Sequence, residues 1–241
     1  MNRRLKIKAA KNKNGFSLAE VLLALTIVGV IASLTIPDLI QNIQSQKLRA
    51  SWKKSFSVLS QAATMMDNDN GASSPWNAVG SDADADSATM RNAFANYLHN
   101  LLRDTTDNVF QPYFCTSDGS GSCWNDFNDP YNSGAMTLAD GTTLQFNVAA
   151  TAGPLVADTA SCNGTRGSLS NICGYITVDV NGVDAPNLVG TDVFSLWIIK
   201  RPNGGAYTQA FGSNDNTTCL TGNSFGGNIG CSYYALIDTD Y

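Results

Sequence analysis

A run of 21 residues from Phe16 to Ile36 carries a single charge, and it follows a strongly basic start. The run reads FSLAEVLLALTIVGVIASLTI, and its one charge is Glu20. A helix of this length is about as long as the hydrocarbon core of a bilayer is thick, roughly 30 Å. A lone carboxylate at membrane depth is costly, so something must make Glu20 tolerable there. The sequence therefore predicts a membrane-spanning helix with one residue that needs a special explanation.

The two ends of the chain have opposite charge. The first 15 residues hold six lysines and arginines and no acid, whereas the rest of the chain has nine bases and 20 acids. A basic segment beside an apolar span is typical of the cytoplasmic side of a membrane. The acidic remainder argues against nucleic acid as a partner. A secretory signal cut near Ala32 is an alternative, although the apolar core of such a signal spans only about 7 to 15 residues.

The helical pattern continues beyond Pro37. Apolar residues recur at steps of mostly three and four as far as Met66, with polar residues between them. This is the pattern of an amphipathic helix that lies on a folded domain. We therefore predict one helix from about Phe16 to about Met66, with its first half in lipid and its second half on a head domain.

The rest of the chain changes from helical to strand-like patterns. Residues 67–88 are acidic and rich in turn formers, which indicates a loop, and residues 88–104 have helical spacing. Strand-like runs follow at 109–115, 135–149, 174–180, 192–200, 206–211 and 231–238. The sequence predicts an α+β fold in which the long N-terminal helix packs on a C-terminal antiparallel sheet, with a second short helix and long loops.

All six cysteines lie after the apolar run, in three sequence-local pairs: Cys115 with Cys123, Cys162 with Cys173, and Cys219 with Cys231. An even number in an exported chain is typical of disulfides, and each local pair would close a short loop. Six cysteines allow 15 connectivities, so spacing alone does not prove the pairing. Metal ligation and free thiols are the alternatives, but no pair has CxxC spacing and His99 is the only histidine.

The segment NGFSLAEVLLALTIVGVIASLTIP, residues 14–37, resembles the class III signal of type IV pilins and type II secretion pseudopilins. In that resemblance Gly15 ends a basic leader and Phe16 is the first mature residue. Glu20 is then the fifth mature residue, and Pro37 is the 22nd. The predicted pilin-like architecture of long helix and antiparallel sheet agrees with this family.

The resemblance implies four parts: a leader 1–15, a transmembrane and filament-core helix 16–36, an amphipathic half 37–66, and an exported α+β head 67–241. It implies a prepilin peptidase that cuts after Gly15 and methylates the amine of Phe16. Other pilin or pseudopilin subunits and an inner-membrane assembly platform are the further partners. The chain is then expected in the bacterial inner membrane with its leader in the cytoplasm, and after assembly in a periplasmic or extracellular filament.

The resemblance also assigns Glu20 and Pro37 to filament assembly. In a dry core of packed helices, the Glu20 carboxylate can face the positive amine of a neighbouring Phe16, so that neither charge is left unpaired. Such a pair would set the register of the subunits more than it adds stability. The alternative is a plain membrane anchor whose carboxylate lies at the interface.

Oxygen-bearing side chains gather in TVDVNGVDAPNLVGTDVFSLWI, residues 177–198. They are Asp179, Asn181, Asp184, Asn187 and Asp192. Hard cations such as calcium need several such oxygens around a tight glycine turn, and some pseudopilins hold calcium in a loop before their last strands. The spacing excludes an EF-hand, because the terminal Glu is missing. The alternative is a set of turn-capping and solvated side chains. Calcium is the one cofactor that the sequence suggests.

No arrangement of catalytic residues is recognisable. With His99 as the only histidine there is no Ser/His/Asp set, and GxSxG, HExxH and P-loop patterns are missing from the sequence. We expect a subunit whose work is assembly, in a secretion pseudopilus or in a pilus for adhesion, motility or DNA uptake. A membrane-anchored exported enzyme or carbohydrate-binding protein is the alternative.

Overall fold

The computed structural model describes residues 15–71, 74–80, 82–98, 102–104, 114–115, 123–124, 134–148, 160–182, 184, 186–202, 205–215, 219 and 230–238. The basic leader up to residue 14 and His99 lie outside these ranges. The chain divides between Gln44 and Ser45 into an N-terminal unit and a head. This boundary falls inside the predicted amphipathic half, residues 37–66.

The longest element is α1 (Leu18–Asn70), one helix that continues through Pro37. By length and composition it could cross a membrane, and none of its most apolar window is buried. From Ser45 onward α1 belongs to the head, and its buried residues recur at steps of one, three and four: Trp52, Ser55, Leu59, Ala62, Ala63 and Met66. The predicted amphipathic pattern is therefore confirmed from Ser45 onward, whereas Ile40 and Ile43, which also belong to the pattern, are exposed. The helix extends four residues beyond its predicted end.

The head contains an antiparallel sheet with the strand order β1-β4-β5-β7-β8-β9. These strands are β1 (Leu102–Asp104), β4 (Ala135–Leu138), β5 (Thr143–Val148), β7 (Leu169–Asp179), β8 (Val193–Lys200) and β9 (Ala206–Ala210). A further strand, β6 (Gly164–Arg166), pairs with β7. Two short strands, β2 (Phe114–Cys115) and β3 (Cys123–Trp124), form a separate ladder.

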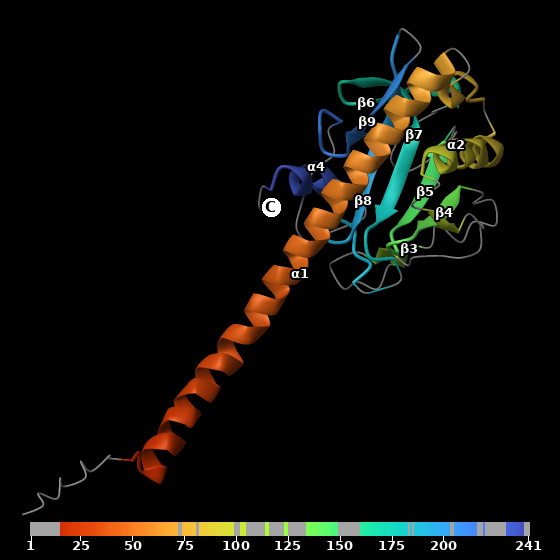
Figure 1. Cartoon of the computed structure of the whole chain (residues 1–241). Helices are drawn as coiled ribbons and strands as arrows, with labels where there is room; N and C mark the ends of the chain where they lie inside the picture. Colours follow the sequence, from red (N-terminus) through yellow and green to blue (C-terminus); the bar gives the residue numbers. More distant parts are fainter. Residues whose placement is uncertain are drawn as a thin grey trace, which may run out of the picture. The chain divides into compact units, whose positions relative to one another are not determined.

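One face of the sheet packs against α2 (Ala83–Tyr97) and the head part of α1, and Figure 1 shows both helices beside the strands. Trp52 of α1 stacks on Phe194 of β8, with ring centroids 5.0 Å apart. Phe94 of α2 lies 5.1 Å from Phe146 of β5, centroid to centroid. The predicted α+β fold, with a long helix on an antiparallel sheet, is confirmed.

The other face of the sheet carries a second, aromatic cluster. Because side chains alternate along a strand, Trp197 of β8 points away from the face that holds Phe194. Trp197 stacks on Phe211 at a centroid distance of 3.7 Å, and its indole nitrogen donates to Asp215 Oδ2 at 2.7 Å. Both of these polar partners are buried, so the hydrogen bond removes the cost of burying them unpaired.

Three local predictions are wrong. Residues 102–104, predicted as the end of a helix, form β1 because they pair with β4. Residues 231–238, predicted as a strand, contain the helix α4 (Cys231–Leu236). Residues 82–86, predicted as a solvated loop, begin α2, since the Asp82 side chain accepts from the backbone N–H of Ala85 as an N-cap.

The helix α4 ties the head part of α1 to the sheet through buried hydrogen bonds. The indole nitrogen of Trp52 donates to the Ser232 carbonyl at 2.8 Å. The Ser232 hydroxyl accepts from the Ser195 N–H at 2.8 Å, and the Tyr233 N–H donates to the Phe211 carbonyl. Ser232 thus joins α1, β8 and α4 at one buried point.

Candidate functional site

The N-terminus of α1 is closed by a reciprocal pair of side chains. Ser17 precedes the first helical residue, and its backbone N–H donates to Glu20 Oε2 at 2.8 Å. The Ser17 hydroxyl donates to the same oxygen at 2.9 Å, and the Glu20 N–H lies 3.3 Å from Ser17 Oγ. This is the S-x-x-E capping box, in which two unpaired helix N–H groups gain partners. The sequence analysis missed this role of Ser17, although the spacing SLAE would have revealed it.

The capping box uses only one of the two carboxylate oxygens of Glu20. Both bonds from Ser17 end on Oε2, and Oε1 accepts no hydrogen bond from any residue that the structure describes. Glu20 also lies in the first turn of α1, where the positive end of the helix dipole favours a negative charge. The carboxylate is therefore stabilised within its own chain and keeps one oxygen for another donor.

The segment after Glu20 presents an apolar surface all round. Its large apolar side chains are exposed, from 44% for Val21 to 70% for Leu34. Its hydroxyl groups bond back to the helix: Thr26, Ser33 and Thr35 donate to carbonyls three or four residues earlier. Polar groups that are satisfied inside the helix suit an apolar surrounding, because no water is available there.

Two of the three sequence-local cysteine pairs are disulfides in the structure, Cys162–Cys173 and Cys219–Cys231. The third pair, Cys115 and Cys123, lies directly opposite in the β2–β3 ladder. The side chains of this pair lie outside the described part of the chain, so its disulfide stays a prediction. The bond to Cys231 holds the start of α4, the helix that contacts Trp52.

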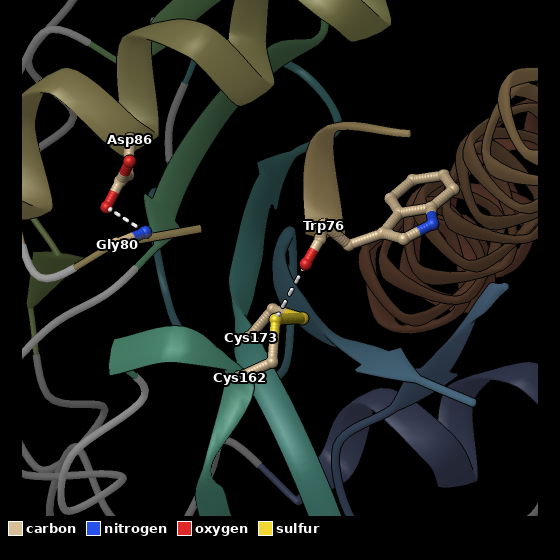
Figure 2. The surroundings of a disulfide bond; sticks show 5 residues. All are labelled: Trp76, Gly80, Asp86, Cys162 and Cys173. Atoms are coloured by element: carbon tan, nitrogen blue, oxygen red, sulfur yellow. Dashed lines mark hydrogen bonds between the residues drawn. A yellow bond between two sulfur atoms is a disulfide. The ribbon is translucent and has the colours of Figure 1, made fainter. Parts of the chain in front are cut away.

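The Cys162–Cys173 disulfide joins the residues just before β6 to β7 (Figure 2). Cys162 ends η4 (Ala160–Cys162), and its Sγ lies 3.3 Å from the carbonyl oxygen of Trp76 in η2 (Pro75–Asn77). Since a disulfide sulfur carries no proton, this is a close polar contact and not a donated bond. Nearby, the Gly80 N–H donates to the Asp86 carboxylate at 2.9 Å, so Asp86 orders the entry to α2.

The predicted calcium loop, between β7 and β8, contains two buried carboxylates. Asp192 is fully buried, and its two oxygens accept from the N–H groups of Asn187 and Leu188 at 2.7 and 2.6 Å. Asp179 is 2% exposed, and its Oδ1 accepts from the Asn181 N–H at 3.2 Å. These bonds within a turn are the Asx pattern that the alternative interpretation predicts.

The side chain of Asn187 fills the centre of this turn. With its nitrogen turned toward Asp179, it donates to Asp179 Oδ2 at 3.1 Å and to the carbonyls of Gly182 and Asp184 at 2.9 and 3.2 Å. The amide thus lies where these three oxygens converge. The Asn181 side chain donates to the Asp184 carbonyl at 2.8 Å, and the Asp184 side chain is exposed. The turn is held together by the chain's own donors.

Burial and mutual repulsion perturb both carboxyls of this turn. Burial, together with the charge of Asp192, raises the pKa of Asp179 to about 8. Burial also raises the pKa of Asp192, against the backbone N–H groups of Leu188 and Asn187, which favour its charged form. Asp179 is therefore mainly protonated at neutral pH in the folded head, which weakens it as a calcium ligand.

Among the residues that the structure describes, no three His, Cys, Asp or Glu side chains gather where they could hold a metal ion. The predicted ligands Asp179 and Asp192 lie in the same turn, but their oxygens are engaged by backbone and amide donors. Calcium binding stays a prediction. It requires calcium to displace the Asn187 nitrogen and the proton of Asp179.

Comparison with known proteins adds two matches. Residues 10–36 match the model of the prokaryotic N-terminal methylation motif, and residues 38–153 match the model of a family of unknown function. No curated protein and no solved structure matches the chain. The first match covers the basic leader's end, Gly15, Phe16 and Glu20, and it ends just before Pro37. The second begins at Asp38 and includes the head part of α1, α2 and the hairpin of β4 and β5.

The first match and the most apolar part of α1 lie on the same segment of the chain. The methylation motif is the signal of type IV pilins and pseudopilins, and it lies on the one described helix that could cross a membrane. The disulfides of the head agree with an exported domain. The chain therefore carries the N-terminal signal of type IV pilins and pseudopilins on an apolar helix long enough to anchor it in a membrane, ahead of a disulfide-bonded head.

Proposed function

We propose that this chain is cut between Gly15 and Phe16 by a prepilin peptidase, N-methylated on Phe16, and assembled with other subunits into a helical filament. The methylation motif at residues 10–36 carries this proposal. The helix that would remain after the cut is exposed and apolar over its span, which suits either lipid or the core of a filament. In this proposal the chain functions by assembling into a filament and not by catalysing a reaction.

Cleavage at this position would keep the capping box. Ser17 and Glu20 both follow the cut, and the peptide bond between Phe16 and Ser17 supplies the Ser17 N–H that Glu20 accepts. Removal of residues 1–15 takes away six positive charges that would otherwise hold the helix at the cytoplasmic face. The mature helix can then leave the bilayer with its N-terminus still capped.

Glu20 would serve two donors at once in the filament. Oε2 stays with Ser17, while Oε1, which accepts nothing in the described structure, receives the methylated amine of Phe16 from a neighbouring subunit. Two opposite charges that meet in a dry core avoid the cost of leaving either one unpaired. The amine exists only after cleavage, so the pairing links processing to assembly.

The intact mass of the protein extracted from membranes tests processing. Loss of residues 1–15 with a gain of one methyl group supports the proposal, and a Gly15→Val variant should keep its leader as a matched control. An intact leader in the native chain, or a cut near Ala32, would favour the rival interpretation of an anchored exported enzyme or carbohydrate-binding protein. The choice among secretion, adhesion, motility and DNA uptake rests on which assembly ATPase and secretin co-purify with the filament.

We also propose a test of calcium at the turn of Asp179 and Asp192. A bound ion stabilises the folded state by mass action, so calcium should raise the melting temperature and a chelator should reverse the rise. Because protonated Asp179 binds poorly, the rise should be larger at pH 9 than at pH 6. An unchanged melting temperature at both pH values would show that the head does not bind calcium.

A further inference from the structure

A pocket of about 290 Å³ lies in the head, between α1 and the turn that joins β4 to β5. Three of its lining residues come from α1, and three come from the end of β4 and the turn after it. They are Lys54, Ser55, Val58, Leu138, Ala139 and Asp140. Pockets for drug-sized ligands span roughly 300–1,000 Å³, so the volume of this pocket suits a small molecule.

The pocket contains a buried hydroxyl group that lacks a hydrogen bond. Ser55 is 5% exposed, and its hydroxyl makes no hydrogen bond with any residue that the structure describes. A hydroxyl inside a helix commonly donates to the carbonyl four residues earlier, as those of Thr64 and Thr89 do here. A buried hydroxyl without a partner costs free energy. The missing partner of Ser55 is therefore to be sought in the pocket.

The walls of the pocket are apolar. Val58 supplies the wall on α1, and Leu138 and Ala139 supply the wall on the side of the sheet. Leu138 is almost completely buried, whereas Ala139 is exposed and lies beside the opening. An apolar group that enters the pocket loses contact with water, which favours binding. The walls therefore select a ligand with an apolar body.

Two opposite charges lie side by side at the mouth of the pocket. The Lys54 ammonium lies 2.6 Å from Asp140 Oδ2, and the two side chains are 58% and 40% exposed. The other oxygen of Asp140 accepts from the Thr142 N–H at 3.1 Å. Burial acts to raise the pKa of Asp140, but the bonds from Lys54 and Thr142 outweigh it and hold the pKa below its ordinary value. Asp140 is therefore charged at neutral pH.

These features together exclude most classes of small ligand. An anion without a positive group would face the Asp140 carboxylate, and a cation without a negative group would face the Lys54 ammonium. A purely apolar molecule would leave the Ser55 hydroxyl unpaired. A molecule with both charges close together and an apolar body avoids all three costs.

We propose that this pocket binds an α-amino acid with an aliphatic side chain. Its carboxylate accepts from the Lys54 ammonium and the Ser55 hydroxyl, and its ammonium donates to Asp140. Its side chain fills the apolar space between α1 and the turn. The four charges then alternate in sign, so the ion pair between Lys54 and Asp140 need not break. Exposed charges contribute more in such a network than in an isolated pair.

This site is independent of the proposed function, since it lies entirely in the head and needs neither processing nor a filament. It would give the exported domain a binding activity of its own. Loss of leader cleavage would leave the amino-acid site in place, and loss of amino-acid binding would leave the filament proposal in place. The two proposals are therefore tested separately.

Isothermal titration of the full chain in mild detergent tests the ligand class, with leucine as the probe. N-acetyl-leucine lacks the positive charge and leucinamide lacks the negative charge, so each should bind about five- to tenfold more weakly than leucine. Glycine keeps both charges but has no side chain, and it should bind more than about tenfold more weakly. This order of affinities follows from the three parts of the proposed site.

Variants of the lining residues test the place of binding. Lys54→Gln and Ser55→Ala should each weaken leucine binding about five- to tenfold. Ala139→Leu fills the pocket from its exposed side and should abolish binding. Lys53→Gln removes the same charge one residue earlier on α1, from a lysine that pairs with Asp238 outside the pocket, and should leave binding unchanged. An unchanged melting temperature shows that each variant is folded.

Several results would overturn the proposal. One is a folded native chain that gives no binding heat with millimolar leucine, and another is binding that the folded Ala139→Leu variant retains. Equal affinity for leucine and N-acetyl-leucine would show that Asp140 does not recognise the ligand ammonium. If leucine does not bind and Ala139→Leu lowers filament incorporation, the pocket holds a side chain of another subunit and the amino-acid proposal is wrong. Binding that follows the expected order in both ligands and variants supports it.

Discussion

The stability of the head should depend on pH through Asp179. Burial and the neighbouring Asp192 raise the pKa of this carboxyl to about 8 in the folded chain. In the unfolded chain the carboxyl titrates near its ordinary value of about 3.9. Between these two values the folded chain holds a proton that the unfolded chain releases. The stability that this proton contributes is complete below about pH 4 and is lost as the pH rises through about 8.

The pKa values set an upper limit on the change in the free energy of unfolding with pH, and two features of the turn make the expected change smaller. The difference between the two pKa values corresponds to roughly 6 kcal/mol at most. The Asn187 amide, with its nitrogen toward Asp179, donates to the charged form and lowers this cost. Local opening of the turn between β7 and β8 would hydrate the carboxylate without global unfolding. We therefore expect the free energy of unfolding to fall by about 1–3 kcal/mol between pH 5 and pH 8.5.

Asp179→Asn should remove this dependence. The asparagine oxygen still accepts from the Asn181 N–H, and the side chain is neutral like the protonated carboxyl that it replaces. The variant should match the native head at pH 5 and exceed its stability by about 1–3 kcal/mol at pH 8.5, because no charge is left beside Asp192.

The assay is urea unfolding of the full chain in mild detergent, followed by tryptophan fluorescence at several pH values. Asp238→Asn makes the same chemical change at an exposed carboxylate and should keep the native pH slope. The reasoning is refuted if native stability stays level or rises from pH 5 to pH 8.5, or if Asp179→Asn keeps the native slope.

Three further predictions concern α1 and α4. Glu20→Gln should leave cleavage and membrane insertion intact but lower filament incorporation about tenfold, because a neutral amide pairs poorly with the amine; normal incorporation in a pull-down of sheared filaments contradicts the pairing. Trp52→Phe leaves the buried Ser232 carbonyl without its donor and should destabilise the head by about 1–3 kcal/mol in urea unfolding; a change within experimental error would show that water replaces the indole. Replacing Cys219 and Cys231 by serine frees the start of α4 and should cost about 2–4 kcal/mol by the same assay, an estimate that unchanged stability would rule out.

The strands of the sheet could be predicted where local pattern and tertiary pairing agree. The segment around Asp140 and Gly141 has turn residues between two apolar runs, and it forms the hairpin of β4 and β5. The β-branched and aromatic residues of β7 and β8 make these strands recognisable without knowledge of their neighbours. Their order in the sheet depends on long-range pairing, which single-sequence patterns do not specify.

The elements that the sequence analysis missed are those in which a tertiary contact decides between conformations. Residues 231–236 contain two tyrosines, which favour a strand, yet they form α4. Ser232 gains buried partners on α1 and β8 only in the observed helix, and the bond between Cys219 and Cys231 fixes where the helix begins. Neither partner lies near this segment in sequence, so no local pattern could have revealed it.

The candidate site shows the opposite case, because a local pattern in the sequence already predicts a contact that the sequence analysis missed. The sequence analysis explained Glu20 by a neighbouring amine, which does not exist before cleavage, or by a position at the membrane interface. The spacing of Ser17 and Glu20 already supplies an internal partner, and the structure forms it. Because the Glu20 carboxylate caps its own helix, it has a hydrogen-bond partner in the membrane before any other subunit binds. Its Oε1 can then accept the amine of Phe16 from a neighbouring subunit during assembly. Assembly would thus add a partner to Glu20 without breaking the one that it has, so the capping box and the filament contact need not compete.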